Sequence, residues 1–439
     1  MRLQSANVCI VLLVGVAGPV LGQAGPALSQ KAIRANSLDQ TETIRVSVAS
    51  GGAQGVGHRP SISFDGRCVA FKGLIPGLGG GVFVRDRVSG TTELMSVDSN
   101  GTPANGASCS LFFASPSISA DGYHVAFDSV ATNLVPGDTA DRQDIFVHDR
   151  QSGITERVSV SSAGAQGNDH SYDPSISSDG RYVAFLSRST NLVPGDTNGW
   201  ADTFVRDRLS GTTERVSVSS AEAQGNFGGG APSITPDGRY VAFLSGSTNL
   251  VPGGLSGIFV RDRLNGTTER VSLDGLVFFG DEGRLLSISS DGRYVALANH
   301  AESLVPGDTN FSGDIFVHDR LSGTTERVSV DSAEAQSNSG SYDPSISADG
   351  RYVAFSSLAS NLVPGDTNGW LDVFVRDRQR GTTTRVSVDS ARAQGNQESY
   401  SPSISADGRH VAFESFADNL VPWDTNGNWD CFLRFWRDR

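Results

Sequence analysis

The chain has 439 residues, 38% of them hydrophobic and 51 of them glycine, and its formal net charge is −13. The acidic excess argues against nucleic-acid binding, because clustered lysines and arginines hold a phosphate backbone. Short aliphatic runs between turn residues predict many short strands and no long amphipathic helix.

The N-terminus carries the pattern of an export signal. Arg2 precedes an apolar run from Val8 to Gly22 with small residues near its end, which is typical of a cleaved secretory signal. We therefore predict a signal peptide over residues 1–22, with an uncleaved anchor as the alternative, and a flexible leader over residues 23–40. The protein is then expected to be secreted, periplasmic or on the cell surface, with no membrane contact after cleavage.

Three cysteines remain after the signal, namely Cys68, Cys109 and Cys431. An odd number in an oxidising compartment allows at most one disulfide, so the chain is not a disulfide scaffold. The sequence leaves open whether any pair forms.

The rest of the chain repeats one unit. The stretch PSISADGRYVAF that begins at Pro344 recurs with small changes, and its Asp-Gly pair marks seven copies spaced 54 to 58 residues apart. The glycines of these pairs are Gly66, Gly122, Gly180, Gly238, Gly292, Gly350 and Gly408. A strand-only period of this size predicts a β-propeller. In the sixth copy, four strand candidates lie near Ser345 and from Arg351, Asp372 and Thr382, and four strands make a propeller blade.

The two ends of the chain complete one another. The pair Asp349-Gly350 predicts a two-residue hairpin turn of the primed type. The seventh copy stops after its third strand, and the missing fourth strand matches TETIRVSV at Thr41 to Val48. We predict an all-β fold: a single seven-bladed β-propeller over residues 41–439 with four-stranded blades, closed by the N-terminal strand 41–48 completing the last blade. Closure would also pair sheet edges that otherwise invite aggregation.

The unit SxDGRYVAF, with its following IFVRD-like and GTTERVS-like strands, resembles the PD40 (WD40-like) repeats of TolB-like β-propellers over residues 41–439. The resemblance implies a propeller. TolB itself has six blades and a separate N-terminal α/β domain, for which this chain has no room. The TolB role in cell-envelope integrity is therefore not carried over, and no functional residue transfers.

The loop after the second strand carries the motif D-x-N-G-x-x-D in several copies. Its Asp, Asn and Asp side chains supply hard oxygen ligands on one tight loop, which predicts calcium as the cofactor. The alternative is that these residues only cap turns. The candidate metal ligands are Asp196, Asn198, Asp202, Asp308, Asn310, Asp314, Asp366, Asn368, Asp372, Asp424, Asn426 and Asp430.

Aromatic residues in the connections between copies are candidate ligand contacts, with packing between blades as the alternative. They are Phe112, Phe113, Tyr172, Phe278, Phe279, Tyr342 and Tyr400. The longer connections, after the second and fourth strands, lie on one side of a propeller, and loops on a rigid scaffold are a common place for binding.

Catalytic motifs are scarce, since the sequence has no Gly-x-Ser-x-Gly elbow, HExxH or phosphate loop. Four acids break the repeat, Asp128, Glu282, Glu398 and Glu414, and a pair of them could serve general acid–base chemistry if close together. Our leading hypothesis is a secreted, non-catalytic propeller that binds a protein, peptide or glycan through its loop-rich side. The alternatives are a carbohydrate-active enzyme, either a polysaccharide lyase or a glycosidase, and a structural surface protein.

Overall fold

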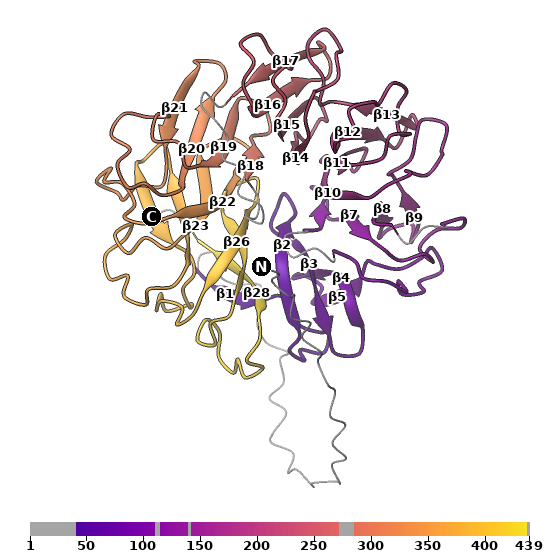
Figure 1. Ribbon diagram of the computed structural model, residues 1–439. Helices are drawn as coiled ribbons and strands as arrows, with labels where there is room; N and C mark the ends of the chain where they lie inside the picture. Colours follow the sequence, from indigo (N-terminus) through magenta and orange to yellow (C-terminus); the bar gives the residue numbers. More distant parts are fainter. Residues whose placement is uncertain (1–40, 110–114, 139–141, 272–284, 437–439) are drawn as a thin grey trace, which may run out of the picture. The chain divides into compact units, whose positions relative to one another are not determined.

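The structure is a computed structural model that describes residues 41–109, 115–138, 142–271 and 285–436. Over these residues the chain forms 28 strands in seven four-stranded antiparallel sheets. The sheets are arranged around a central axis as the blades of a propeller (Figure 1). The predicted all-β, seven-bladed fold is confirmed.

Each blade is numbered by its order in the chain, from blade 1 (β2 to β5) to blade 7 (β26 to β28 with β1). The first strands are β2 (Val56–Ile62), β6 (Ser117–Ile118), β10 (Ser171–Ile176), β14 (Gly229–Ile234), β18 (Leu286–Ile288), β22 (Ser341–Ile346) and β26 (Ser399–Ile404). The second strands are β3 (Cys68–Ile75), β7 (His124–Ser129), β11 (Tyr182–Ser187), β15 (Tyr240–Ser245), β19 (Tyr294–Asn299), β23 (Tyr352–Ser357) and β27 (His410–Ser415). The third strands are β4 (Gly79–Asp86), β8 (Asp144–Asp149), β12 (Asp202–Asp207), β16 (Gly257–Asp262), β20 (Asp314–Asp319), β24 (Asp372–Asp377) and β28 (Asp430–Phe435). The fourth strands are β5 (Thr91–Leu94), β9 (Thr155–Arg157), β13 (Thr212–Arg215), β17 (Thr267–Arg270), β21 (Thr324–Arg327), β25 (Thr382–Arg385) and β1 (Thr43–Arg45).

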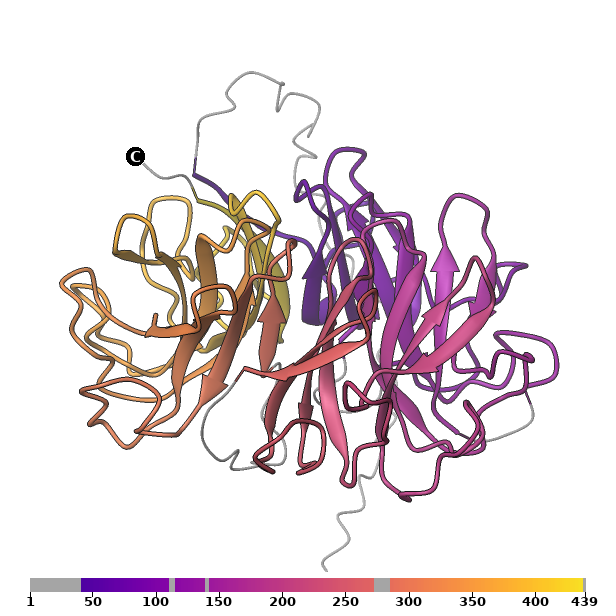
Figure 2. The same ribbon diagram turned by 90° about the horizontal axis from the view of Figure 1, so that it is seen from above.

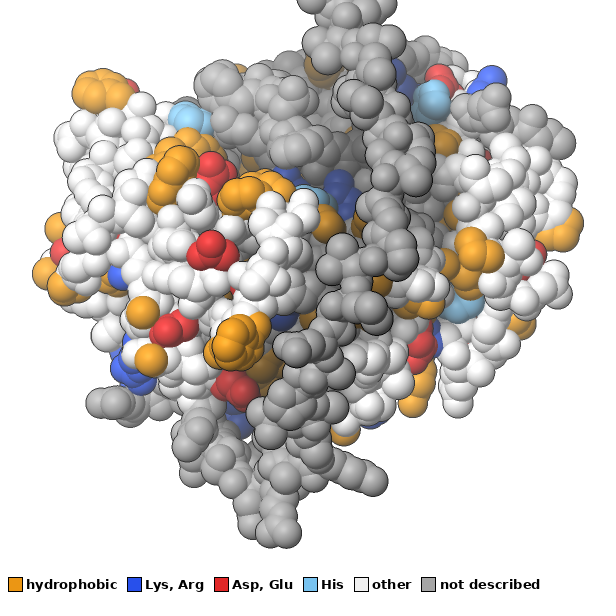
Figure 3. All heavy atoms as spheres, turned by 90° about the horizontal axis from the view of Figure 1, so that it is seen from below, with side chains coloured by type: hydrophobic (Ala, Val, Ile, Leu, Met, Phe, Trp, Pro, Cys, Tyr) orange, Lys and Arg blue, Asp and Glu red, His pale blue; other side chains and the backbone are white. Residues whose placement is uncertain are grey.

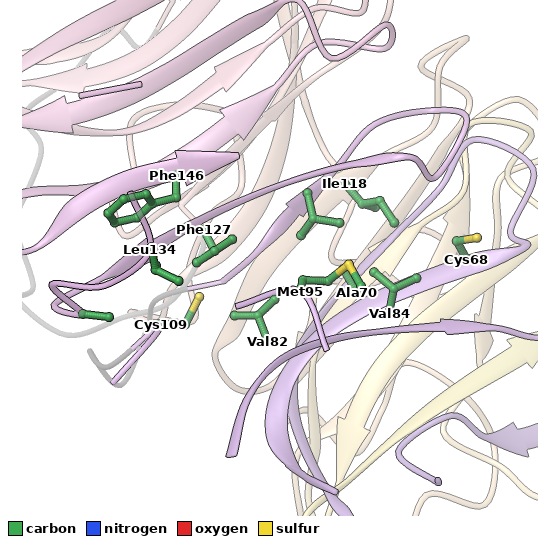
Figure 4. Packing of buried hydrophobic residues seen from close by; sticks show 12 residues of the cluster. Cys68, Ala70, Val82, Val84, Met95, Cys109, Ile118, Phe127, Leu134 and Phe146 are labelled. Carbon is green, nitrogen blue, oxygen red and sulfur yellow. The ribbon is translucent and has the colours of Figure 1, made fainter. Parts of the chain in front are cut away.

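The apolar runs of the second and third strands build the core between blades. Ala70 and Val84 of blade 1 are fully buried against Val125 and Phe127 of blade 2 (Figure 4). A sheet that is covered on both faces needs apolar residues at consecutive positions, so the usual alternation of polar and apolar residues is absent. This packing explains why VAF and FV recur in the sequence.

The N-terminal strand closes the ring. β1 pairs antiparallel with β28, with Thr43 opposite Arg434. The Ser47 hydroxyl donates to the Asp430 carboxylate at 2.5 Å, and the Val46 amide donates to the Cys431 carbonyl at 2.8 Å. The predicted closure is confirmed, although the regular strand is shorter than residues 41–48.

The Asp-Gly turn differs from the primed hairpin that we predicted. Gly350 has a φ of +71°, but Asp349 is not among the residues with positive φ, and a primed turn of type I′ needs it at both positions. The Ser347 amide donates to the Tyr352 carbonyl, and the Gly350 amide donates to the Ser347 carbonyl, each at 2.9 Å. The Asp349 carboxylate accepts from the Ser347 hydroxyl and the Arg351 amide. The turn is therefore a longer loop in which glycine alone takes the left-handed conformation.

Repeated charged residues tie neighbouring blades together beside these turns. The Arg351 guanidinium makes two hydrogen bonds with the Asp377 carboxylate, at 2.9 and 2.6 Å. Arg378 lies over the ring of Tyr294 in the preceding blade, 4.5 Å from its centroid. These side chains recur because each blade needs the same joint to its neighbour.

The strand order places the turns between first and second strands, and between third and fourth strands, on one side of the propeller. The other side, which we call the loop face, carries the connections after the second and fourth strands, such as residues 188–201 and 216–228 in blade 3. Figure 2 shows the blades side on, with connections projecting from both sides. Within the described ranges, no helical segment has the length and apolarity that a membrane crossing requires. The three cysteines predicted to remain after the signal are buried and free.

Candidate functional site

A central cavity lies among the first strands. It has a volume of about 200 Å³, and its lining includes Asp173, Ser175 and Ser233. The serines of the PSIS repeats also join the blades, since the Ser175 hydroxyl accepts the Ile234 amide of the next blade at 3.2 Å and Ser345 accepts the Ile404 amide at 3.1 Å. The hydroxyl groups therefore recur for a structural reason and give the cavity a polar wall.

The start of the first strand carries a bulge in several blades, and two of the bulge residues, Asp173 and Ala231, line the central cavity. In five blades the residue before the repeat proline is left-handed, with φ of +53° at Arg59, +56° at Asp173, +48° at Ala231, +54° at Asp343 and +53° at Ser401. Such a conformation is costly for residues other than glycine, and bulges re-aim side chains. The backbone is the same each time, but the side chain is different.

A second variable position follows the VAF run of the second strand. The residues there are Lys72, Asp128, Leu186, Leu244, Ala298, Ser356 and Glu414. Glu414 shows where this position points, because its two carboxylate oxygens lie 3.6 Å from Nε of Arg59 and 3.0 Å from Nδ1 of His58 in the next blade. At the boundary between blades 7 and 1, the residue at this position therefore meets the bulge residue of the next blade. The chemistry is charged around blades 7, 1 and 2 and aliphatic from blade 3 to blade 5.

Arg59 is the centre of a buried ionic cluster. It is 5% exposed, and its guanidinium lies 3.9 Å from the Asp343 carboxylate and 5.9 Å from the centroid of the Tyr400 ring. Tyr400 also packs edge-on against Trp429 at 4.9 Å between ring centroids. Burial raises the pKa of the Tyr400 hydroxyl. Blades 1, 6 and 7 therefore meet in one cluster.

A pair of carboxyl groups lies at the boundary between blades 2 and 3. Asp128 is fully buried, and burial raises its pKa to about 6 although Gln143 donates a hydrogen bond to it. Burial, together with the charge of Asp128, raises the pKa of Asp173 to about 7. The nearby Lys72 donates to the carbonyl of Cys109 at 3.3 Å, and burial lowers its pKa. The two carboxyl groups, Asp128 and Asp173, are therefore poised to change protonation near neutral pH.

We use the name channel mouth for the ionic cluster around Arg59 taken together with the two carboxyl groups. The channel mouth consists of Arg59, Asp128, Asp173, Asp343, Tyr400 and Glu414.

The loops predicted to bind calcium hold an arginine instead. In blade 3, the amide of Gln224 donates to Asp196 at 2.7 Å and to Asp202 at 2.9 Å. The Arg215 guanidinium lies 3.4 Å from Asp196 and 3.5 Å from Asp202. Asn198 donates its amide to Asp202 at 3.2 Å. Carboxylates that would converge on a cation thus converge on a guanidinium and an amide.

The same network recurs in blades 5, 6 and 7. Its members there are Asp308, Asn310, Asp314, Arg327 and Gln336 in blade 5, Asp366, Asn368, Asp372, Arg385 and Gln394 in blade 6, and Asp424, Asn426, Asp430 and Arg45 in blade 7. In blade 7 the Gln54 side chain instead donates to the Trp423 carbonyl and accepts the Thr425 amide. In this arrangement the residues do not fit a calcium ion, because an arginine already supplies the positive charge. Within the described part of the chain, no group of three or more His, Cys, Asp or Glu side chains could hold a metal. Calcium binding stays a prediction.

The predicted aromatic contacts fall into two groups. Tyr172, Tyr342 and Tyr400 each precede a bulge residue and are half-buried at the loop-face end of a first strand. Tyr172 accepts a hydrogen bond from Arg188 at 3.2 Å, and Tyr400 belongs to the channel mouth. The candidates Phe112, Phe113, Phe278 and Phe279, and the acid Glu282, lie outside the described residues. A ligand role for the tyrosines stays a prediction.

Sequence reasoning missed the bulge residues. Arg59, Asp173 and Asp343 stand one position before the repeated proline. The signal that could have found them is that this position varies between copies whose neighbouring residues repeat. At Asp173 and Asp343 it also follows a candidate tyrosine. Of the four acids that break the repeat, Asp128 and Glu414 lie at the channel mouth, while Glu398 is half-buried just before Tyr400.

Comparison with known proteins supports the fold. No protein-family model matches the chain, and no curated protein matches it. An oligogalacturonate lyase in complex with manganese is similar in structure, with a TM-score of 0.50 and 14% identity over 91% of this chain and 96% of the lyase. An oligogalacturonate lyase from Vibrio parahaemolyticus gives 0.52 and 12% over 90% and 93%. TolB from Acinetobacter baumannii gives 0.39 and 16% over 76% and 81%. The chain thus has a propeller fold similar to that of the two lyases.

Proposed function

We propose that this protein is a secreted binding protein that takes a small glycan or peptide ligand at the channel mouth. The sequence pattern of residues 1–22 supports export. Concave sites that combine aromatic rings with a few converging polar groups are the usual form of a ligand site. The channel mouth has both, at the end of the central cavity on the loop face.

The broken repetition of the channel mouth carries this proposal. Residues that join blades recur from copy to copy, as Arg378 and Ser345 do in blade 6. At the channel mouth the backbone recurs, but the side chains change from Arg59 to Asp173 to Ala231. A structural joint would repeat, whereas an asymmetric ligand requires a different group from each blade.

The size of the central cavity, about 200 Å³, supports a small ligand over a broad protein partner. Figure 3 views the propeller side on, and there hydrophobic side chains of the described residues lie in separate small groups among polar ones. Large apolar patches mark tight protein interfaces, and this side view shows none among those residues.

A carbohydrate-active enzyme is the second candidate, and one observation favours it. Asp128 and Asp173 lie together with pKa values raised to about 6 and about 7, which suits a general acid or base near neutral pH. The two lyases of similar structure act on oligogalacturonate according to their names. Their identity to this chain is 14% or less, so the likeness extends to the fold and suggests a substrate class to test.

The test is a binding screen of the mature chain, residues 23–439, against glycans and peptides, with turnover of each glycan followed in parallel. Arg59→Met and Asp173→Asn should each weaken any hit at least tenfold. Arg67→Met is the matched control, because Arg67 follows an Asp-Gly turn on the opposite side and pairs with Asp86 at 2.7 Å. A ligand whose affinity is unchanged by both mouth variants would refute the site, and turnover abolished by Asp173→Asn would favour the enzyme.

A further inference from the structure

Two equivalent boundaries between blades carry opposite chemistry. Between blades 7 and 1, the residue after the VAF run is Glu414 and the bulge residue is Arg59, so an acid meets a cation at 3.6 Å. Between blades 2 and 3, the same two positions hold Asp128 and Asp173. There an acid meets another acid, and the charge of Asp128 raises the pKa of Asp173. The protein itself thus shows what is missing at the second boundary, namely a positive group.

The acid pair also has unused hydrogen-bonding capacity. Asp128 is fully buried, and among the described residues its Oδ1 has no hydrogen-bond partner. Asp173 lines the central cavity and makes no ion pair or hydrogen bond through its carboxylate within the described ranges. Buried carboxylates are normally paired or hydrogen-bonded. The pair therefore has room for a donor that carries positive charge.

The neighbouring cations are engaged elsewhere. The charge of Arg59 lowers the pKa of Asp173 from a distance, but the ion pairs of Arg59 are with Asp343 and Glu414. The charge of Lys72 lowers the pKa of Asp128, and the Lys72 ammonium donates a hydrogen bond to the backbone carbonyl of Cys109.

Two other groups, Cys109 and Gln143, contact Asp128. Cys109 is a buried thiol that acts on Asp128. Gln143 donates its side-chain amide to Asp128, and its backbone amide donates to the ring of His170 at 3.1 Å. None of these groups gives Asp173 a formal counter-charge.

The cavity limits the size and chemistry of what reaches Asp173. Its volume of about 200 Å³ and its serine-rich lining suit the polar end of a ligand and not a whole oligosaccharide, because drug-sized ligands occupy roughly 300–1,000 Å³. An ammonium group has three donors and no acceptor. Two carboxylates and a wall of hydroxyl groups supply the acceptors that it needs.

We propose that Asp173, which lines the central cavity, binds the ammonium group of an amine-bearing ligand, such as an amino sugar or a peptide amino terminus, inserted into that cavity, with the negative charge of Asp128 adding to the attraction. This inference rests on the proposed function, since it names the chemistry of a ligand at the same channel mouth. The ammonium replaces the proton that Asp173 otherwise holds at mildly acidic pH. Binding then releases a proton at mildly acidic pH, and the affinity rises as the pair becomes ionised.

The experiment uses titration calorimetry of the mature chain at about pH 6 and about pH 8. The probes are two matched pairs: a glucosamine trisaccharide and its fully N-acetylated form, and triglycine amide and its N-acetylated form. The sugar and peptide arms identify the source of the amine. A free-amine probe should bind about fourfold more tightly at the higher pH, because the ionised fraction of Asp173 rises about tenfold across its pKa while roughly half of the probe's amine, whose pKa is about 8, loses its proton. Its acetylated partner should bind at least tenfold more weakly at both pH values.

Variants keep this test specific. Asp173→Asn should weaken binding of the free amine at least tenfold and remove the rise in its affinity with pH. Glu214→Gln, on the outer strand of the same blade where Glu214 pairs with Arg263, should bind like the wild type. Equal binding of free and acetylated probes would overturn the inference, as would a divalent metal that binds alone and is lost in Asp173→Asn. Failure of every amine while another ligand still depends on Arg59 would overturn it and leave the proposed function standing.

Discussion

Replacing Asp173 with asparagine should stabilise the protein, and only above mildly acidic pH. The folded protein raises the pKa of Asp173 from 3.8 to about 7. Between these two values the folded state holds a proton that the unfolded state has released, so the free energy of unfolding falls as the pH rises. Below about pH 4 both states are protonated and the penalty vanishes. Asparagine has nearly the same shape and carries no charge, so it removes the penalty.

The magnitude follows from the size of the pKa change. A difference between 3.8 and about 7 corresponds to roughly 4 kcal/mol at about 1.36 kcal/mol per pKa unit. Asp173 faces a cavity that water can enter and is coupled to Asp128, so we expect about 2 kcal/mol at pH 8. The gain should shrink steadily toward zero by about pH 4.

The assay is urea unfolding of wild type and Asp173→Asn at a series of pH values. Asp207→Asn is a control of opposite sign, because the Arg181 guanidinium hydrogen-bonded to Asp207 holds the pKa of that carboxyl below its usual range. That variant should be less stable than wild type at neutral pH, with the difference lost as the pH falls. Asp173→Asn that is destabilised at every pH, or stabilised equally at every pH, would refute the buried-acid reasoning.

Three further predictions concern the scaffold. Deleting residues 23–40 should leave the melting temperature unchanged, while removing residues 41–48 as well should lower it by at least about 5 °C, because the last blade loses its outer strand; equal melts would contradict ring closure. Arg385→Met should cost about 1–3 kcal/mol by leaving its two buried aspartate partners without a cation, and a chelator should not change the melting temperature; a chelator-dependent loss would show that the sequence prediction of calcium was right. Gly350→Ala should cost at least about 2 kcal/mol in thermal or urea unfolding, since φ is +71° and a Cβ would lie 2.2 Å from a tyrosine ring of the preceding blade. Gly365→Ala, with φ of +76° and open space around it, should cost only about half as much.

The fold could be predicted because each copy of the sequence repeat encodes one blade of the propeller. Each copy carries the same apolar runs and the same turn residues, so an error in one copy is corrected by the others. The joint between the chain ends was also readable, since TETIRVSV at residues 41–48 completes an otherwise missing strand. The turn type was wrong because Asp349-Gly350 fits both a primed turn and a longer loop that needs positive φ only at glycine. The choice depends on Ser347, whose hydrogen bonds the sequence does not show.

The chemistry of the site was harder, because it depends on strands distant in sequence. The acids of the D-x-N-G-x-x-D loops were visible as a motif. Their partners Arg215 and Gln224 follow Asp202 by 13 and 22 residues and belong to the next strand and the next loop. They change the electrostatics of the loop, because the positive charge near the two aspartates comes from an arginine side chain. A motif shows which ligands are available and not what already occupies them.

The bulge explains how a repetitive protein builds a site without repetition. Left-handed residues other than glycine cost on the order of 1 kcal/mol or more each, yet the chain keeps this conformation at Arg59, Asp173, Ala231, Asp343 and Ser401. Asp173 and Ala231 belong to adjacent blades and both line the central cavity, so side chains from different blades can reach one ligand there. The Asp173 carboxylate makes no hydrogen bond or ion pair within the described ranges, so such a contact does not account for its bulge. Access to the cavity does account for it, and it implies that exchanging Asp173 or Ala231 should change which ligand is bound while the propeller stays folded.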